Sequence, residues 1–304
     1  MFKFILGLGC FWLGLEISKR NLKKLTGNKF KNYFYRLKNN LYLCLISGIL
    51  FTAIIQSSSA VSIILIGLIE AKLIDLKSAL LIMMGANIGT TVTVQIISFP
   101  ILSFYPVLII SGITLIILGY NCNYLNKIGK IFMAFGLVFF GLNLMTSFFN
   151  DPHIKNFFYE MLATYGQNKY YGIIIGVLST SILQSSSAVT GITVSLSYNN
   201  IISLPGAVAI AMGSNIGTCI TGFLASFNAG ITSKNLAKRH FTFNIIGVLI
   251  FIPFFNLFIE LISLSSSVLT RQIANAHTFF NLFNVIFLLP FLNTFVCWQE
   301  KGDK

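Results

Sequence analysis

The chain has 304 residues, of which 55% are hydrophobic and only 10% are charged, and its formal net charge is +13. Soluble domains carry about 25% charged residues, so the few charges here cannot cover the surface of a soluble protein. The composition therefore excludes an ordinary soluble enzyme, a nucleic-acid-binding protein and a disordered chain. It predicts one membrane domain over residues 1–304, with about eight to ten segments if each needs roughly 20 residues and a loop.

Nine apolar segments follow one another along the chain. They are expected at 2–17, 41–70, 77–99, 101–119, 128–148, 170–198, 203–228, 240–262 and 278–298. The polar stretch at 149–169 lies near the middle of the chain and is expected to connect two halves, 41–148 and 170–298. The segment 2–17 would then be a helix that precedes the first half.

The basic residues are concentrated near the start of the chain. Eight of the 21 Lys and Arg residues lie between Lys19 and Lys38, with no acidic residue among them. A short basic loop between apolar segments is typical of the cytoplasmic side of a membrane. We therefore expect a multi-pass protein of the cell membrane whose positive charge sets its topology and faces anionic lipid. Nucleic acid is not expected as a partner.

An internal repeat is the strongest pattern in the sequence. Gln56–Val61 recurs unchanged as Gln184–Val189, and Gly85–Thr90 recurs with one substitution as Gly213–Thr218. Both copies are offset by 128 residues, and a gapless alignment around them has 22 identities in 47 positions. A shared apolar composition does not preserve two polar motifs at equal spacing, so the chain contains a duplication.

Each Gln-Ser-Ser-Ser motif interrupts an apolar segment. Serine favours helix caps over helix interiors, and unsatisfied polar groups facing lipid are costly. We therefore expect each segment to break there, as a discontinuous helix or a re-entrant hairpin. A half-helix beginning near Ala60 or Ala188 would direct free N–H groups at an anion, while hydroxyl and amide oxygens suit sodium. The alternative interpretation is that these polar side chains only bind helices together.

The Gly-x-Asn-Ile-Gly-Thr motifs carry two signals. Glycines four residues apart, such as Gly85 and Gly89, are typical of a helix-packing face. Glycine next to asparagine also permits an unwound turn, after which threonine hydroxyls could meet a serine motif. Both interpretations stay open from the sequence.

A third motif, His-x-x-Phe-Asn, occurs twice, at His240–Asn244 and His277–Asn281 in the second half. Its His and Asn share one helix face. We expect structural histidines, with Asn244 and Asn281 as accessory site residues. No Cys, Asp or Glu neighbours the histidines at ligand spacing, so a transition metal is not expected. The three motifs contain no carboxylate, which favours sodium over protons, and the chain has no nucleotide-binding motif. We expect no cofactor.

The doubled motifs resemble those of the type II sodium–phosphate cotransporters, especially the bacterial branch, over nearly the whole chain. The resemblance implies an all-α polytopic fold with two inverted repeats and re-entrant hairpins. It implies sodium-coupled transport of inorganic phosphate by alternating access around a central site, and no enzymatic activity. This chain has no His-x-x-Phe-Asn motif after the first repeat, so a symmetric role for histidine is not expected. Many bacterial members continue into a C-terminal regulatory helical domain, so this sequence, which stops at Lys304, either lacks that domain or is part of a longer protein.

The resemblance also assigns residues. It implies that phosphate is bound by six serines: Ser57, Ser58, Ser59, Ser185, Ser186 and Ser187. It implies that sodium, the only metal expected, is bound by amide and hydroxyl side chains: Gln56, Asn87, Thr90, Thr91, Gln184, Asn215 and Thr218. The oligomeric state stays open.

Three alternatives differ from this interpretation. The same architecture could transport another small oxyanion or a carboxylate. An intramembrane serine hydrolase would pair Ser58 or Ser186 with a histidine, but a nucleophile needs one oriented base, and the repeats do not share one. A channel would conduct without saturation.

Overall fold

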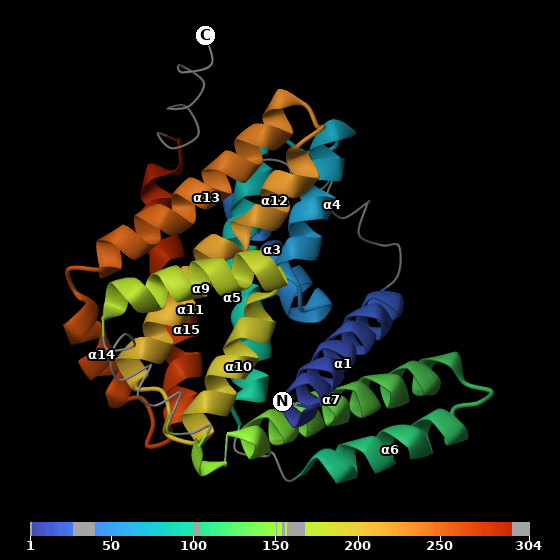
Figure 1. Ribbon diagram of the computed structural model, residues 1–304. Helices are drawn as coiled ribbons and strands as arrows, with labels where there is room; N and C mark the ends of the chain where they lie inside the picture. Colours follow the sequence, from blue (N-terminus) through green and yellow to red (C-terminus); the bar gives the residue numbers. More distant parts are fainter. Residues whose placement is uncertain are drawn as a thin grey trace.

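The computed structural model describes residues 2–26, 40–99, 104–149, 151–153, 156 and 168–293. All regular elements in these ranges are helices (Figure 1). In chain order they are α1 (Phe2–Thr26), α3 (Leu41–Ile55), α4 (Ser58–Glu70), α5 (Leu76–Ile97), α6 (Tyr105–Leu118), α7 (Asn123–Phe148), α9 (Lys169–Leu183), α10 (Ser186–Tyr198), α11 (Leu204–Gly217), α12 (Cys219–Ser226), α13 (Ile231–Phe251), α14 (Phe255–Ser263), α15 (Leu269–Leu288) and the 3-10 turn η3 (Leu289–Phe291). The all-α prediction is confirmed.

Both Gln-Ser-Ser-Ser motifs break their segment into two helices, as predicted, and with the same backbone geometry. Gln56 and Gln184 adopt a left-handed conformation, with φ of 55° and 51°, and end α3 and α9. Ser57 and Ser185 are the N-caps of α4 and α10, because their side-chain oxygens accept backbone N–H groups at 3.2 and 3.3 Å. The new helices begin within two residues of the positions expected.

Some of the expected membrane segments are long single helices and others are shorter. Within the described residues, four helices are long and apolar enough to cross a membrane, and α13 and α14, bent by 82°, would make a fifth crossing if they form one span. Others are shorter apolar helices: α3 and α4 have 15 and 13 residues, and about 20 are needed to cross. The breaks therefore divide the segment expected at 41–70, and the number of eight to ten segments stays a prediction.

The repeat continues from the hairpins into the next helices. The first and last residues of α3 and α4 recur 128 residues later as those of α9 and α10. Helix α5 corresponds to the span Leu204–Ser226, and this span divides into α11 and α12 at Thr218. This repetition confirms two homologous halves with broken hairpins. The limits 41–148 and 170–298, and the inverted orientation of the halves, stay predictions.

The glycines of Gly-x-Asn-Ile-Gly-Thr form packing faces. A Cβ built on Gly85 would lie 2.1 Å from the backbone oxygen of Leu45 in α3, and one on Gly213 would lie 2.0 Å from that of Ile173 in α9. Helix α5 runs without interruption through Asn87. Of the two interpretations left open by the sequence, the first copy therefore shows the packing face and no unwound turn, whereas in the second copy the helix divides at Thr218. Close helix packing, made possible by the missing side chains, keeps the segment helical.

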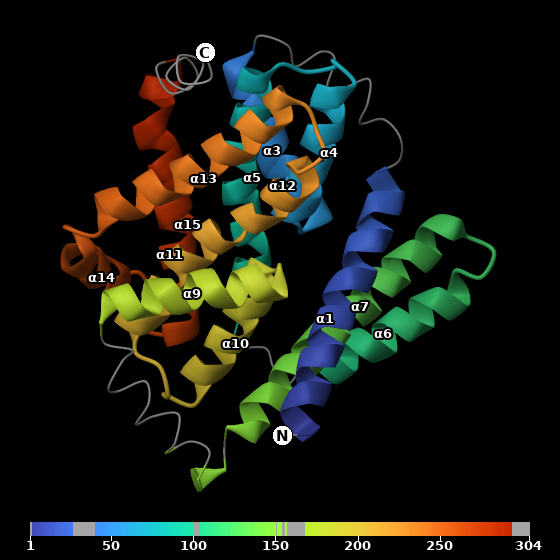
Figure 2. The same ribbon diagram turned by 45° about the horizontal axis from the view of Figure 1, so that its top comes forward.

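The two halves interlock. Helix α4 of the first half packs against α12 of the second, and α10 of the second half packs against α5 of the first. Figures 1 and 2 show that α1, α6 and α7 form a separate group of helices to one side. This group contacts the second half through Phe11, whose ring lies against Gly191 of α10. Most of the predicted basic loop 18–40 and the connector lie outside the described residues, although α1 extends beyond the predicted 2–17.

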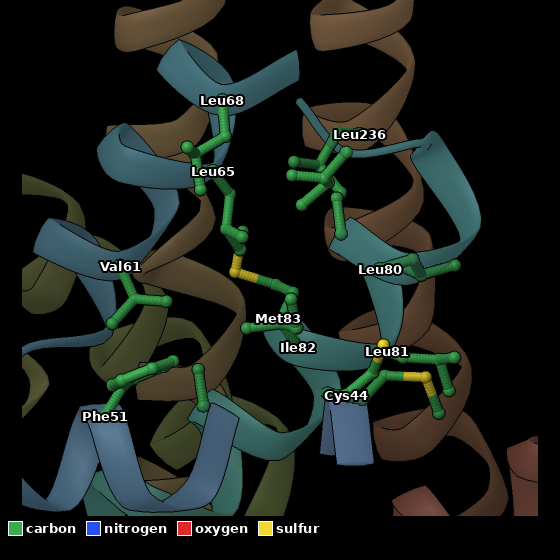
Figure 3. Close-up of a cluster of buried hydrophobic side chains, with 14 of the residues drawn as sticks. Cys44, Phe51, Val61, Leu65, Leu68, Leu80, Leu81, Ile82, Met83 and Leu236 are labelled. Atoms are coloured by element: carbon green, nitrogen blue, oxygen red, sulfur yellow. The ribbon is translucent and has the colours of Figure 1, made fainter. Parts of the chain in front are cut away.

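A cluster of buried apolar side chains fixes the first hairpin. Figure 3 shows Leu65 and Leu68 of α4 near Met83 of α5, with Leu236 of α13 beside them. The Ser62 hydroxyl donates to the Met83 sulfur at 3.2 Å. Dispersion contacts and interhelical hydrogen bonds of this kind hold helices together in lipid, where apolar burial alone supplies no driving force.

Exposed apolar side chains cover the outer faces of several helices. On α9, Ile174, Leu178 and Ile182 are exposed and lie four residues apart, which places them on one stripe. An exposed apolar stripe of this length is unfavourable in water and favourable in a bilayer. The chain is therefore a multi-pass membrane protein, as the composition predicts.

Candidate functional site

Each serine motif lies where one half-helix ends and the next begins. Ser58, Ser186 and Ser187 are buried, whereas Ser57, Ser59 and Ser185 are partly buried. In both views of the molecule, the α3–α4 break and the α9–α10 break lie next to one another near its centre (Figures 1 and 2). The arrangement of the two breaks is compatible with one site made by both serine motifs, and that shared site stays a prediction.

Each break leaves hydrogen-bond donors at the start of a half-helix. The first N–H groups of a helix have no partner within it, and the N-cap serines Ser57 and Ser185 satisfy one of them in each half. The remaining N–H groups and the neighbouring hydroxyls lie at the positive ends of the α4 and α10 dipoles. This arrangement favours a small anion.

A buried hydrogen-bonded triad surrounds Asn87 in the first half. The His240 Nε2–H donates to Asn87 Oδ1 at 3.1 Å, since an amide oxygen can only accept. Asn87 Nδ2 donates to Asn244 Oδ1 at 2.9 Å, and Asn244 Nδ2 donates to the backbone oxygen of His240 at 3.0 Å. Both ends of the Asn87 amide therefore have protein partners.

The corresponding triad in the second half lacks one of the hydrogen bonds of the first. His277 Nε2–H donates to Asn215 Oδ1 at 3.2 Å, and Asn281 Nδ2 donates to the backbone oxygen of His277 at 2.8 Å. Asn215 Nδ2 and Asn281 Oδ1, the donor and acceptor equivalent to the bonded pair in the first half, are buried without a partner. The two triads thus share their histidine bond and differ in their asparagine–asparagine bond.

Cys219 connects the two Gly-x-Asn-Ile-Gly-Thr motifs. Asn244 Nδ2 donates to the Cys219 sulfur at 3.2 Å, and the Cys219 thiol donates to the backbone oxygen of Asn215 at 3.6 Å. A continuous hydrogen-bonded chain therefore runs from Asn87 in the first half to Asn215 in the second. Buried polar networks of this kind restrain the relative placement of the helices that carry them.

The sequence did not predict this pairing of histidines with asparagines. The expectation of an asymmetric role for histidine is wrong, because each Gly-x-Asn-Ile-Gly-Thr motif has its own histidine, although His240 and His277 both come from the second half. The shared spacing of the two His-x-x-Phe-Asn motifs was the signal for a common role. Cys219 gave no signal, because a cysteine among apolar residues resembles a small hydrophobic side chain.

The predicted threonines and glutamines take up less symmetric positions. The hydroxyls of Thr90, Thr91 and Thr218 donate to backbone oxygens of their own helices at 2.9, 2.7 and 2.7 Å. Only their oxygen lone pairs are then left for a cation. Gln56 is buried, whereas Gln184 is exposed. Their roles in sodium binding stay predictions. Among the described residues, no cluster of three or more His, Cys, Asp or Glu could hold a metal ion.

The chain is similar to known membrane proteins over most of its length. A family model described as Na+/Pi-cotransporter matches residues 10–147 and 153–288, and each matched part contains one copy of both duplicated motifs. YqeW, an uncharacterized protein of Bacillus subtilis, is 29% identical over 244 residues, which are 80% of this chain and 79% of YqeW.

Two further relatives carry names that describe phosphate. YjbB of Escherichia coli, named for inorganic phosphate export, is 26% identical over 81% of this chain and 45% of its own length. The human sodium-dependent phosphate transport protein 2B is 31% identical over 47% of this chain and 20% of its own length. The chain thus covers less than half of these two relatives. No solved structure matches it.

Proposed function

Because the chain belongs to the Na+/Pi-cotransporter family, we propose that it carries inorganic phosphate across the cell membrane together with sodium. The observation that supports this most directly is the pair of equivalent helix breaks, each of which begins a new half-helix, α4 or α10, at a Gln-Ser-Ser-Ser motif. Transporters built from repeats bind their substrates at such discontinuous helices.

Phosphate would bind between the two breaks. Backbone N–H groups at the starts of α4 and α10 would donate to its oxygens, together with the hydroxyls of Ser58, Ser59, Ser186 and Ser187 and, when reoriented, those of the N-caps. Because each half supplies one break, a movement of one half relative to the other would expose the site to one face of the membrane at a time. The interlocked packing of α4 on α12 and of α10 on α5 offers the surfaces for that movement.

Sodium would neutralise the anion. The duplicated motifs contain no carboxylate, and their oxygens come from amides and hydroxyls. Neutral oxygen ligands suit a monovalent hard cation, whereas proton-coupled transporters use titratable groups in the membrane. The Nε2 atoms of the two motif histidines bond to Asn87 and Asn215 and not to a serine. These contacts give no support to the serine hydrolase alternative.

The test is phosphate flux in proteoliposomes. We expect radiolabelled phosphate uptake to rise several-fold when external choline is replaced by sodium at constant ionic strength. Liposomes preloaded with phosphate test the opposite direction, which the name of the E. coli relative suggests. If a proton gradient alone drives full transport, the sodium assignment is wrong.

A competition assay tests the alternative substrate. Unlabelled arsenate, sulfate and small carboxylates are added in excess to the same uptake reaction. Arsenate is expected to compete because it shares the tetrahedral shape and charge of phosphate. Stronger competition by sulfate or by a carboxylate than by phosphate itself would favour another anion on the same architecture.

A further inference from the structure

Two buried threonines have hydroxyls that bond to nothing. Thr52 in α3 and Thr180 in α9 are 0% exposed, and neither Oγ1 atom has a hydrogen-bond partner. The two residues occupy equivalent positions, because they are 128 residues apart and four residues before Gln56 and Gln184. The duplication has therefore retained an unsatisfied buried hydroxyl in both halves.

Other buried threonines in the structure avoid this situation. The hydroxyls of Thr90, Thr190 and Thr193 donate to the backbone oxygen four residues earlier, at 2.8 to 2.9 Å. Thr93 is a third buried threonine without a partner, but the hydroxyl of its counterpart Thr221 donates to a backbone oxygen at 2.8 Å. Among the described threonines, Thr52 and Thr180 are the only repeat-related pair in which both hydroxyls lack a hydrogen-bond partner. A repeated unsatisfied group points to a ligand.

The surroundings of both threonines suit a cation. Each lies in the last turn before a break, where the final carbonyl groups of a helix have no partner within it and carry the negative end of the dipole. The Thr52 and Thr180 carbonyls are already used, because the N–H groups of Gln56 and Gln184 donate to them at 2.6 and 2.7 Å. The later carbonyls of the turn are left for a ligand.

Both threonines also lie against the second duplicated motif. A Cβ built on Gly89 would lie 2.8 Å from the Cβ of Thr52, and one built on Gly217 would lie 2.7 Å from the Cβ of Thr180. Each threonine therefore lies between its own helix break and the Gly-x-Asn-Ile-Gly-Thr helix. The two duplicated motifs of each half therefore flank its threonine.

We propose that Thr52 and Thr180 are sodium ligands, one in each half, and that each hydroxyl acts with the free carbonyls at the end of α3 or α9. The proposal rests on the proposed function and deepens it. Each break would then bind a cation at the C-terminal end of one half-helix and the anion at the N-terminal end of the next. Unwound segments and half-helix ends coordinate ions in this way in transporters. The attraction between the two bound charges couples their movement.

The test separates the hydroxyl from the shape of the side chain. T52V and T180V remove the hydroxyl and keep the volume, whereas T52S and T180S keep the hydroxyl. We expect each valine variant to raise the sodium concentration for half-maximal phosphate uptake about tenfold, which corresponds to the loss of one good ligand. The serine variants should stay within about twofold of the wild type. T93V is the matched control, since it removes an unsatisfied buried hydroxyl outside the proposed sites.

A second measurement does not depend on transport. Sodium chloride should raise the unfolding temperature of the wild type and the serine variants relative to choline chloride, because a ligand that binds the folded state stabilises it. The shift should fall in T52V and T180V. T52A and T180A replace the valine variants if those do not fold. The unfolding temperature of T52V and T180V without sodium should not fall, because the lost hydroxyl has no bond to lose.

The outcomes distinguish the two proposals. A wild type that depends on sodium, with valine variants of unchanged sodium dependence, overturns the threonine sites and leaves the proposed function intact; the hydroxyls then bind water. A wild type whose uptake and unfolding temperature are both indifferent to sodium overturns the sodium coupling and the threonine sites together. An effect of T93V equal to that of T52V also overturns the assignment.

Discussion

The two helix breaks have the same backbone and different surroundings. Gln56 is 3% exposed and its side-chain oxygen accepts the Ser18 hydroxyl of α1 at 3.3 Å, whereas the equivalent Gln184 is exposed. The local geometry follows the duplicated sequence, because the same left-handed residue and the same serine cap recur. The environment follows the rest of the chain, because α1 supplies a hydrogen-bond partner to Gln56 whereas Gln184 lies at the surface. Duplication therefore copies a site's backbone without copying its exposure.

The two asparagine–histidine triads also share one part of their geometry and differ in another. The Asn87–Asn244 bond is made, and the atoms equivalent to it in Asn215 and Asn281 are unpaired. The first half thus holds its asparagine on both sides, and the second half holds it only through His277. Four experiments break or sharpen this comparison.

The largest effect is expected where the halves are most alike. G85A and G213A each place a Cβ about 2 Å from a backbone oxygen of the neighbouring helix, at 2.1 and 2.0 Å. The helices must separate, which we expect to cost about 3 kcal/mol of unfolding free energy in both variants. Thermal unfolding in detergent measures it. G67A in α4 is the control, because nothing lies within 4 Å of its Cβ. A large difference between G85A and G213A would contradict equivalent packing in the two halves.

The serine motifs should be equally necessary for transport. S58A and S186A are each expected to reduce phosphate uptake by at least about tenfold, since each removes a hydroxyl from one side of the proposed anion site. The unfolding temperature should change little. S111A in α6 removes a hydroxyl that donates to the Leu108 backbone oxygen and serves as the control. Normal uptake in S58A or S186A would place the anion elsewhere.

The triads should differ in stability. N244A leaves the buried Asn87 Nδ2 without an acceptor, whereas N281A removes an oxygen that has no partner. We expect N244A to lower the unfolding free energy by about 1 kcal/mol more than N281A, in line with hydrogen bonds measured in membrane proteins. A double-mutant cycle checks the cause: in an N87A background the N244A effect should shrink. Equal losses in N244A and N281A would mean that the second triad also closes.

The smallest effect concerns the left-handed residues. Glycine adopts a positive φ without strain, so Q184G should raise the unfolding free energy by about 0.5 kcal/mol. Q56G should gain less, because it also loses the hydrogen bond from Ser18. K72G, at an exposed residue with φ of 56°, calibrates the gain from glycine alone. A gain in Q56G equal to that in Q184G would show that the Ser18 contact contributes nothing to stability.

Several features of this protein could be predicted from particular residues. The Gln-Ser-Ser-Ser motifs inside apolar segments predicted the positions of both helix breaks, because a helix in lipid does not tolerate four consecutive polar residues in its interior. The glycine spacing around Asn87 and Asn215 left helix packing and an unwound turn both open, and the structure shows the packing. These are local effects: they depend on neighbours in the chain and on the solvent.

The composition, the duplication, the membrane class and the two broken hairpins were therefore determined by the sequence itself. The tertiary structure alone decided which histidine meets which asparagine, the link through Cys219, the bend between α13 and α14, and the isolation of the Thr52 and Thr180 hydroxyls. The physical reason is distance along the chain. His240 lies 153 residues from Asn87, so their contact depends on how whole helices pack. A threonine in an apolar run likewise shows no sign of lacking a partner until every neighbouring helix is in place.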